Sequence, residues 1–350
     1  MRIIYILFMF FVLLSCNSKG LFDNKEIVVT VFPETHELKG DSIQLDVLGC
    51  VDLYCVDLYC VDTFLIAYTP MSEKGYFHVF STSDFELLGS FIPIGRGPNE
   101  FYAVNYSSAY KTDDGQVKAW LSNDVMNYEW NITQSVKQKQ TVIDTAYKLQ
   151  GVLSDGVWLP GRDNLMFGFI KRNNNVEYTR YDLKTKKVIN ANKMFSRDLA
   201  TDKIATASMP PCLKPDNSKV ANIGWWTNYI CIFNADFSDM KIVAIYHKPE
   251  SIDQISATER EERILYYSCS DATDQYVYAL YVNQPEKDRR YHFGYEEIHI
   301  FDWNANPVAK FIIRENIMFF RVDAYNKCLY GLTSDEKVYC YDVSSYLKEL

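Results

Sequence analysis

Cysteine and aspartate recur together in one short segment, CVDLYCVDLYCVD from Cys50 to Asp62, with a period of five residues. Thiolates and carboxylates are metal ligands, so this segment is the first candidate for a metal site. An odd period, however, sends successive copies to opposite faces of a β-strand, so that Cys50 and Cys60 share a face while Cys55 points away. A duplication of five residues explains the pattern more simply, and we predict no metal site here.

The histidines also lack the spacing of a metal site. They are His36, His78, His247, His292 and His299. No pair forms His-x-His or His-Glu-x-x-His, and the chain contains no Cys-x-x-Cys and no Gly-x-Ser-x-Gly sequence. Contiguous motifs therefore predict no catalytic residue, no cofactor and no metal ion. His78 and His299 each stand two residues before an aromatic residue that ends a strand, which makes them equivalent positions in two repeats.

The elements that hold these residues are β-strands. Short runs rich in Val, Ile, Tyr and Phe alternate with polar turns, and helical periodicity is scarce. Six strands end in an aromatic residue followed by Ser, Asn or Asp, and these aromatic residues are Phe80, Trp130, Tyr181, Phe233, Phe301 and Tyr341. Their separations of 50, 51, 52, 68 and 40 residues are in the range of propeller blades. The sequence thus predicts an all-β, six-bladed β-propeller.

The interval of 68 residues contains two insertions. In SATEREERILYY, Ser256 and Glu259 have the spacing of a capping box, which predicts a short helix. The run NQPEKDRRYHFGYEE from Asn283 has the composition of a long hairpin tip.

The last repeat contains three strands, near Met318–Asp323, Cys328–Leu332 and Val338–Tyr341, one short of a four-stranded blade. We predict that the N-terminal run Ile27–Phe32 supplies the fourth strand and thereby removes an exposed sheet edge. Residues 27–350 then form a single propeller domain, although the length alone would suggest two domains.

The chain starts with Arg2, an apolar run from Ile3 to Leu14, and then Ser15 and Cys16. Twelve apolar residues are too few to span about 30 Å of hydrocarbon, and LLSC resembles a bacterial lipobox. We predict a lipoprotein signal peptide over residues 1–15, lipidation of Cys16, a tether over residues 16–26, and attachment to the membrane through the lipid alone. The alternatives are an ordinary signal peptide or a buried first strand.

The composition excludes one large class of partners. A net charge of -9 and a pI near 5.2 argue against nucleic-acid binding, which needs clustered Lys and Arg to neutralise phosphates. With 48% apolar residues the chain can bury a large core, and it does not depend on disulfides.

Three features together suggest a family: GRGPNEF from Gly95 to Phe101, FLIAY from Phe64, and the lipobox at Cys16. With them the sequence resembles the TolB-like six-bladed β-propeller lipoproteins of Gram-negative bacteria. The resemblance implies that the heptapeptide connects the first blade to the second, although Asn99 stands where the family commonly has Gly. It implies a fold and a location in the bacterial cell envelope, on the periplasmic or the surface side, but no chemistry, because most of the family has no assigned activity.

The residues of the heptapeptide suit a connection between blades. Its two glycines permit backbone angles closed to other residues, and Phe101 can anchor the next strand in the core. Arg96 and Glu100 can form an ion pair across the connection. A phosphate-binding loop is excluded, because the Gly-Lys-Ser/Thr ending is missing.

Two groups of residues are candidates for binding. In the hairpin tip the candidates for partner contact are Arg289, Arg290, Tyr291, Phe293 and Tyr295, since Arg and Tyr are enriched at interfaces. Arg321 and Asp323, on the expected inner strand of the last blade, can face the channel. We predict a non-catalytic propeller that binds a protein, peptide or glycan. The alternative is an envelope hydrolase or lyase, whose channel site would leave no contiguous motif.

Overall fold

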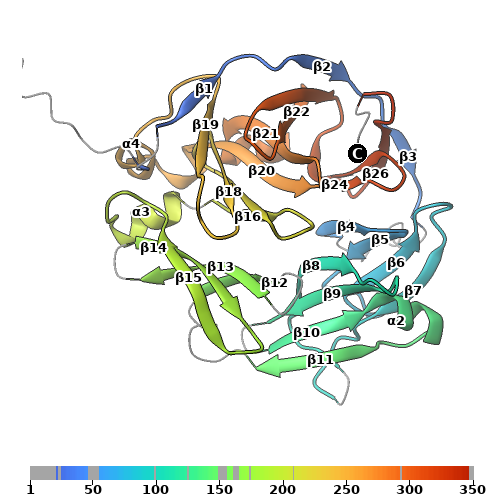
Figure 1. Cartoon of the computed structure of the whole chain (residues 1–350). Coiled ribbons are helices and arrows are strands. Elements are labelled where there is room, and N and C mark those ends of the chain that lie inside the picture. The colour runs from blue at the N-terminus through green and yellow to red at the C-terminus, as the bar shows by residue number, and fades with distance from the viewer. Residues whose placement is uncertain are drawn as a thin grey trace, which may run out of the picture.

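Runs of β-branched and aromatic residues form strands that assemble into six antiparallel sheets, placed in a ring around a central channel (Figure 1). This arrangement confirms the predicted six-bladed propeller. The computed structural model describes residues 21–22, 25–45, 55–97, 100–123, 126–148, 156–160, 165–172, 175–207, 209–291 and 294–346.

The strands follow one another from the channel outward in each blade. Blade 1 consists of β4 (Asp57–Val61), β5 (Phe64–Tyr68), β6 (Phe77–Ser81) and β7 (Leu87–Phe91), and blade 2 of β8 (Asn105–Lys111), β9 (Val117–Ser122), β10 (Met126–Asn131) and β11 (Ile143–Lys148). Blade 3 consists of β12 (Gly156–Pro160), β13 (Leu165–Arg172), β14 (Asn175–Asp182) and β15 (Lys187–Lys193), and blade 4 of β16 (Pro211–Leu213), β17 (Lys219–Ile223), β18 (Tyr229–Asn234) and β19 (Lys241–Ile245). Blade 5 consists of β20 (Ile264–Ala272), β21 (Tyr276–Pro285), β22 (Glu296–Asp302) and β23 (Pro307–Ile313), and blade 6 contains β24 (Ile317–Asp323), β25 (Cys328–Thr333) and β26 (Val338–Asp342).

All six recurring aromatic residues lie on the third strand of a blade. Phe80, Trp130, Phe233, Phe301 and Tyr341 are almost completely buried between neighbouring blades. The polar residue that follows each of them holds the next turn. Asp302 Oδ1, for example, accepts hydrogen bonds from the backbone N–H groups of Asn304 (2.8 Å) and Asn306 (2.9 Å). The aromatic-polar pair recurs because every blade needs both a buried ring and a turn.

An N-terminal strap, residues 27–43, runs around the outside of three blades (Figure 1). Its strand β1 (Ile27–Val29) pairs in parallel with β19 of blade 4, and β2 (Glu34–Glu37) pairs in parallel with β23 of blade 5. The third strand, β3 (Asp41–Ile43), pairs antiparallel with β26 and completes blade 6. Closure by an N-terminal strand is confirmed, but the prediction that Ile27–Phe32 closes the ring is wrong, because that apolar run covers the edge of blade 4.

Short helices occupy the connections. They are α2 (Ile132–Gln138), α3 (Thr201–Thr206), α4 (Ile252–Ala257), η3 (Arg260–Glu262) and η4 (Glu286–Tyr291). The capping box in the insertion before blade 5 is made by Ser251 and Gln254, five residues earlier than the sequence pattern predicted. Across the described residues, every helix is too short or too polar to span a bilayer.

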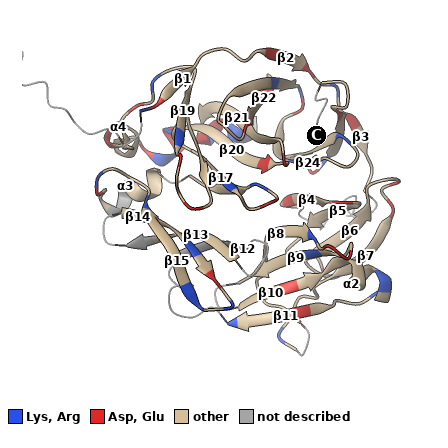
Figure 2. Ribbon diagram, viewed as in Figure 1, with Lys and Arg blue, Asp and Glu red and all other residues tan. Residues whose placement is uncertain are grey.

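The antiparallel order gives the ring two distinct faces. The inner strands end at one face, the turn face, which also carries the turns between first and second and between third and fourth strands. The opposite face, the loop face, carries the loops between second and third strands and the connections from blade to blade, including α3, α4 and η4. Figure 2 shows Lys and Arg interspersed with Asp and Glu on the blades.

Candidate functional site

A cavity of about 500 Å³ lies in the central channel. Its wall consists of parts of the inner strands β4, β8, β16, β20 and β24. The turn after β16 contributes Lys214, Pro215 and Asn217, while β20 and β24 contribute Ser270–Ala272 and Arg321 from near their C-terminal ends. Because inner strands end at the turn face, the cavity lies toward that face of the channel.

Arg321 is the central charge of the cavity. Its Nη2 donates to Asp57 Oδ2 (2.9 Å) and its Nη1 donates to the carbonyl oxygen of Phe320 (2.7 Å). The side chains of Arg321 and Asp57 are 15% and 18% exposed, so this ion pair is held largely out of water. It joins the inner strand of blade 6 to that of blade 1.

A stack of planar groups continues from this arginine across the channel. The Arg321 guanidinium lies 5.1 Å from the centre of the Tyr59 ring. The other neighbour of Tyr59 is Tyr106 of blade 2, whose ring centre is 3.7 Å away at an angle of 12°. The stack therefore fixes three inner strands relative to one another and gives the cavity an aromatic side.

Asp271 supplies a second carboxyl group to the same cavity. It accepts hydrogen bonds from the backbone N–H groups of Val322 (2.7 Å) and Ala272 (2.9 Å). Burial raises the pKa of Asp57 and the pKa of Asp271, although Arg321 counteracts both shifts. Two carboxyl groups thus share one buried guanidinium, and a further positive or hydrogen-bond-donating group would stabilise both as anions.

The lysines at the cavity wall do not offset this excess of acid, because each has its own partner. Lys111 Nζ lies 2.8 Å from Asp62 Oδ1, and Lys214 Nζ lies 2.9 Å from Asp216 Oδ2. The thiols in the wall are neutral, since burial raises the pKa of Cys212 to about 12 and raises that of Cys60 as well. Among the described residues no three His, Cys, Asp or Glu side chains are grouped as a metal ion would require.

A second buried network lies between blades 4 and 5, away from the cavity. Glu297 accepts hydrogen bonds from Tyr246 Oη (2.6 Å), His299 Nε2 (2.8 Å) and Lys310 Nζ (2.7 Å). His299 Nδ1 is 3.0 Å from the hydroxyl of Tyr267, which donates to it. Burial works against the charge of Glu297, but these donors lower its pKa to about 2. The pKa of His299 is lowered by burial, so its imidazole is neutral.

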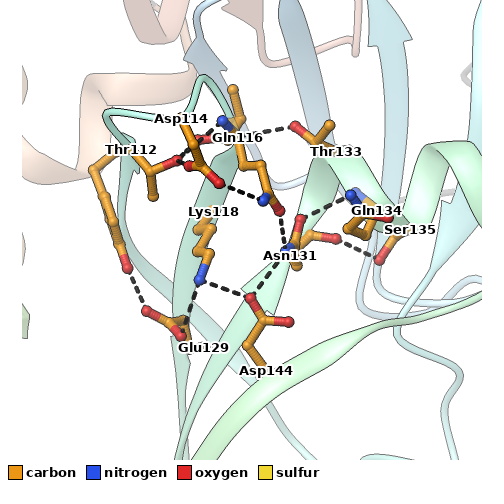
Figure 3. Close-up of polar contacts among 12 residues, drawn as sticks. Thr112, Asp114, Gln116, Lys118, Glu129, Asn131, Thr133, Gln134, Ser135 and Asp144 are labelled. Atoms are coloured by element: carbon orange, nitrogen blue, oxygen red, sulfur yellow. Dashed lines mark hydrogen bonds and ion pairs between the residues drawn. The ribbon is translucent and has the colours of Figure 1, made fainter.

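A third network crosses blade 2 (Figure 3). Lys118 Nζ is 2.7 Å from Asp144 Oδ2 and 3.5 Å from Glu129 Oε2, and Asn131 Nδ2 donates to Asp144 Oδ2 (2.9 Å) and Gln116 Oε1 (2.8 Å). These groups come from β9, β10, β11 and the turn before β9, and they satisfy one another within the sheet. The network therefore holds strands together and offers no open polar group for a ligand.

The heptapeptide between blades 1 and 2 forms a tight, self-bonded connection. Gly97 N donates to Glu100 Oε2 (2.7 Å), and the backbone N–H of Gly95 donates to the carbonyl oxygen of Phe101 (3.0 Å). Phe101 is buried and packs edge-on against Tyr128 of blade 2, at 5.1 Å. Glu100 thus bonds to backbone rather than in the expected ion pair with Arg96, whose guanidinium lies 5.0 Å from the Tyr102 ring.

A family model described as TolB-like 6-blade propeller-like matches residues 54–325. The chain belongs to this family. The match covers the cavity, the heptapeptide and the inner strands of all six blades. No curated protein matches the chain significantly.

Solved structures resemble this TolB-like propeller in fold. A putative exported protein from Bacteroides fragilis NCTC 9343 is 11% identical, with a TM-score of 0.52 over 90% of this chain and 99% of that chain. A member of the duf4221 family from Bacteroides vulgatus ATCC 8482 is 12% identical, with a TM-score of 0.49 over 88% of this chain and 98% of that chain. At such identity the likeness concerns the fold alone.

The TolB-like propeller separates the two residues that the sequence placed in the channel. Arg321 lies on the cavity wall, as described above. Asp323, two residues later, is buried and bonded to the turn after β24: its carboxylate accepts from Asn326 N (2.9 Å), Asn326 Nδ2 (2.8 Å) and Tyr330 Oη (3.2 Å). Asp323 therefore shapes the turn and does not line the cavity.

The predicted partner-binding tip is divided in a similar way. Arg289 is 5% exposed, pairs with Glu296 through Nη1, and donates to the carbonyl oxygen of Ile317. Its charge thus fastens η4 to the blades below it. Tyr295 is 54% exposed on the loop face. The side chains of Arg290, Tyr291 and Phe293 lie outside those that the structure describes.

Sequence reasoning missed Asp57, Tyr59 and Asp271 as cavity residues. Asp57 and Tyr59 belong to the last full copy of the Cys50–Asp62 repeat, which attracted attention as a metal site rather than as an inner strand. Most of the first copy lies outside the described residues, as does Cys16. Asp271 stands in no motif, and only the closed ring brings it beside Arg321.

Proposed function

We propose that the chain is a lipoprotein of the bacterial cell envelope, anchored through a lipid on Cys16, and that its propeller is a binding module. The sequence MRIIYILFMFFVLLSC supports export and lipidation, as argued above. Membership of the TolB-like propeller family and the fold likeness to a putative exported protein support the same location. In this proposal the lipid is the only membrane anchor, and the propeller stays in the aqueous phase.

The ligand class follows from one observation, the two buried carboxyl groups that share one guanidinium. Asp57 is paired with Arg321, while Asp271 has backbone N–H partners and no cation of its own on the page. A ligand that brings an ammonium or several N–H and O–H donors would favour the ionised form of Asp271. The stack of Tyr59 and Tyr106 gives the same cavity an apolar side. This combination fits the amino end of a short peptide or an amino sugar of a glycan.

Calorimetric titration with two ligand sets tests this proposal. One set consists of short peptides with free amino ends and their N-acetylated forms, and the other of amino-sugar oligosaccharides and their N-acetylated forms. We expect binding of at least one free-amine ligand, weakened at least tenfold by its acetylation and by Asp271→Asn. Asp84→Asn, an exposed carboxylate on the turn face, is the matched control and leaves binding unchanged. Equal affinity of the wild type and Asp271→Asn for every ligand would contradict the proposal.

The alternative of an envelope hydrolase or lyase has its own supporting observation. General acids work best when their pKa is raised toward the working pH, and burial raises the pKa of both Asp57 and Asp271 beside one cavity. Incubation of the bound ligands with the protein, followed by mass spectrometry, distinguishes the two functions. Cleaved or eliminated product that disappears in Asp271→Asn favours the enzyme, while intact ligand after many hours favours the binding module.

A further inference from the structure

Two residues close to the proposed lipid site are held against the body of the propeller. The carbonyl oxygen of Leu21 accepts hydrogen bonds from Ser196 N (3.0 Å) and Ser196 Oγ (3.3 Å). Phe22 is 8% exposed, and its ring lies 5.2 Å from that of Tyr229 and 6.1 Å from that of Phe195. Leu21 and Phe22 thus form a clamp, which fastens the start of the described chain between blades 3 and 4.

The clamp lies on the loop face. Phe195 follows the fourth strand of blade 3, and Tyr229 begins the third strand of blade 4. In an antiparallel blade, the end of the fourth strand and the start of the third lie at the edge opposite to the end of the inner strand. The cavity, by contrast, is lined by residues near the ends of inner strands and by the turn after β16. The clamp and the cavity therefore belong to opposite faces of the ring.

The chain between the lipid site and the clamp is short. Residues 17–20 separate Cys16 from Leu21, so five residue-to-residue steps join them. An extended chain advances at most about 3.5 Å per residue, which limits the distance from Cys16 to Leu21 to about 17 Å. A lipid on Cys16 would hold the loop face within this distance of the bilayer, since the clamp leaves no further slack.

Apolar side chains are exposed on the same face. In the loops between second and third strands, Met71, Trp225 and Tyr295 are 75%, 40% and 54% exposed, and in the connection from blade 1 to blade 2, Ile94 and Tyr102 are 37% and 66% exposed. They come from blades 1, 4 and 5 and from the connection to blade 2, so they are spread around the ring. Tyr and Trp are the residues that favour the membrane-water interface.

We propose that the loop face rests on the lipid bilayer, with the clamp as its pivot and the exposed Tyr, Trp and Met side chains in the interfacial layer, so that the cavity opens away from the membrane. The inference rests on the lipidation of Cys16 proposed above. Because basic and acidic residues are interspersed on the blades (Figure 2), the contact depends on apolar side chains and the tether rather than on attraction to anionic lipids.

Hydroxyl-radical footprinting of the lipidated full-length protein tests the orientation. The protein is reconstituted on the outside of phosphatidylethanolamine and phosphatidylglycerol vesicles, and oxidation is read by mass spectrometry against the unlipidated Cys16→Ser variant in solution. We expect oxidation of Tyr102, Trp225 and Tyr295 to fall at least threefold on vesicles. Tyr325, which is 68% exposed in the turn after β24 on the turn face, is the internal control and keeps its rate. Equal rates at the three loop-face residues, or protection of Tyr325, would overturn the proposal.

Failure of this inference is distinguishable from failure of the proposed function. Flotation with the vesicles reports whether the lipid is present, and a protein that does not float overturns both the anchor and the orientation. A protein that floats without protection of the loop face overturns the orientation alone. Ligand titration reports on the cavity and is independent of both results.

The role of the short tether is tested by its length. A ten-residue Gly-Ser insertion between residues 20 and 21 raises the maximum reach to about 50 Å. We expect at least half of the protection at Trp225 to be lost while flotation persists. The same insertion between Asp114 and Gly115, in an exposed turn of the turn face, is the control and leaves the protection intact. Unchanged protection with the longer tether would overturn the role of the clamp.

Discussion

The ring of Phe32 in the N-terminal strap lies 4.5 Å from the imidazole of His299, at an angle of 35°. His299 belongs to the buried network of Glu297, Tyr246 and Lys310 between blades 4 and 5. Phe32 also meets Phe301 edge-on at 5.5 Å. The strap therefore does more than pair with sheet edges, because it closes a polar network that water would otherwise enter.

Phe32→Ala should destabilise the propeller. Phe32 is 6% exposed, and truncation of a buried Phe costs about 3–5 kcal/mol through lost burial and the cavity that remains. We expect this loss in the free energy of unfolding from urea titration. Val31→Ala is the matched control on the same strap, and since Val31 is 72% exposed it should change little. Similar losses in both variants would mean that the strap acts through its backbone alone.

Glu297→Gln should destabilise the protein in a pH-dependent way. The pKa of Glu297 is lowered from 4.5 to about 2, so the native state favours the carboxylate and its contribution is present above pH 4.5. A shift of this size corresponds to about 3 kcal/mol. The difference in unfolding free energy between wild type and variant should be largest near pH 7 and shrink as the pH falls toward 2. A difference independent of pH would contradict this assignment.

Arg321→Met should be among the most damaging single changes in the channel. It leaves the buried carboxyl of Asp57 without its partner and removes one end of the stack on Tyr59, and breaking a buried pair costs about 3–5 kcal/mol. Arg321→Lys keeps the charge but loses the planar contact, so it should recover part of the loss. Arg314→Met, an exposed arginine paired with Glu37, is the control. Urea unfolding of the three variants measures the order.

Asp271→Asn should show the opposite pH trend to Glu297→Gln. Burial raises the pKa of Asp271, so the contribution of this group is fully present below pH 3.8 and is lost as the pH rises through the raised pKa. The variant does not titrate at this position. Wild type should therefore be most stable relative to the variant near pH 4 and lose that advantage toward pH 7. An advantage that grows with pH would show that Asp271 ionises readily in the native state.

The blades could be predicted because their signal is local. Phe301 and Asp302 act within one strand and its following turn, so their types and order are visible in the sequence before any tertiary contact is known. Five other blades repeat the same need at similar spacing. The closing strand could not be predicted in the same way. Asp41–Ile43 is short and half polar, while the more strand-like Ile27–Val29 pairs elsewhere, and the choice between the two is made by tertiary packing.

The cavity was less visible for a related reason. Asp57, Asp271 and Arg321 come from three blades, and no spacing along the chain links them. Arg289 shows the converse, since a charged residue in a polar run reads as exposed until Glu296 is found opposite it. In both cases the deciding partner is contributed by the folded ring.

The order in which the strap strands pair has a consequence for how the chain matures after export. Ile27–Val29 waits for Val243–Ile245, Glu34–Glu37 for Ala309–Ile312, and Asp41–Ile43 for Val338–Cys340. The first segment to emerge from a secretion channel is thus the last to find its partners, and these contacts span 200 to 300 residues of sequence. Until the C-terminal blade has crossed, three sheets keep open edges that invite association with other chains. Ring closure should therefore be the slow step of folding, and the step at which periplasmic chaperones have most to protect.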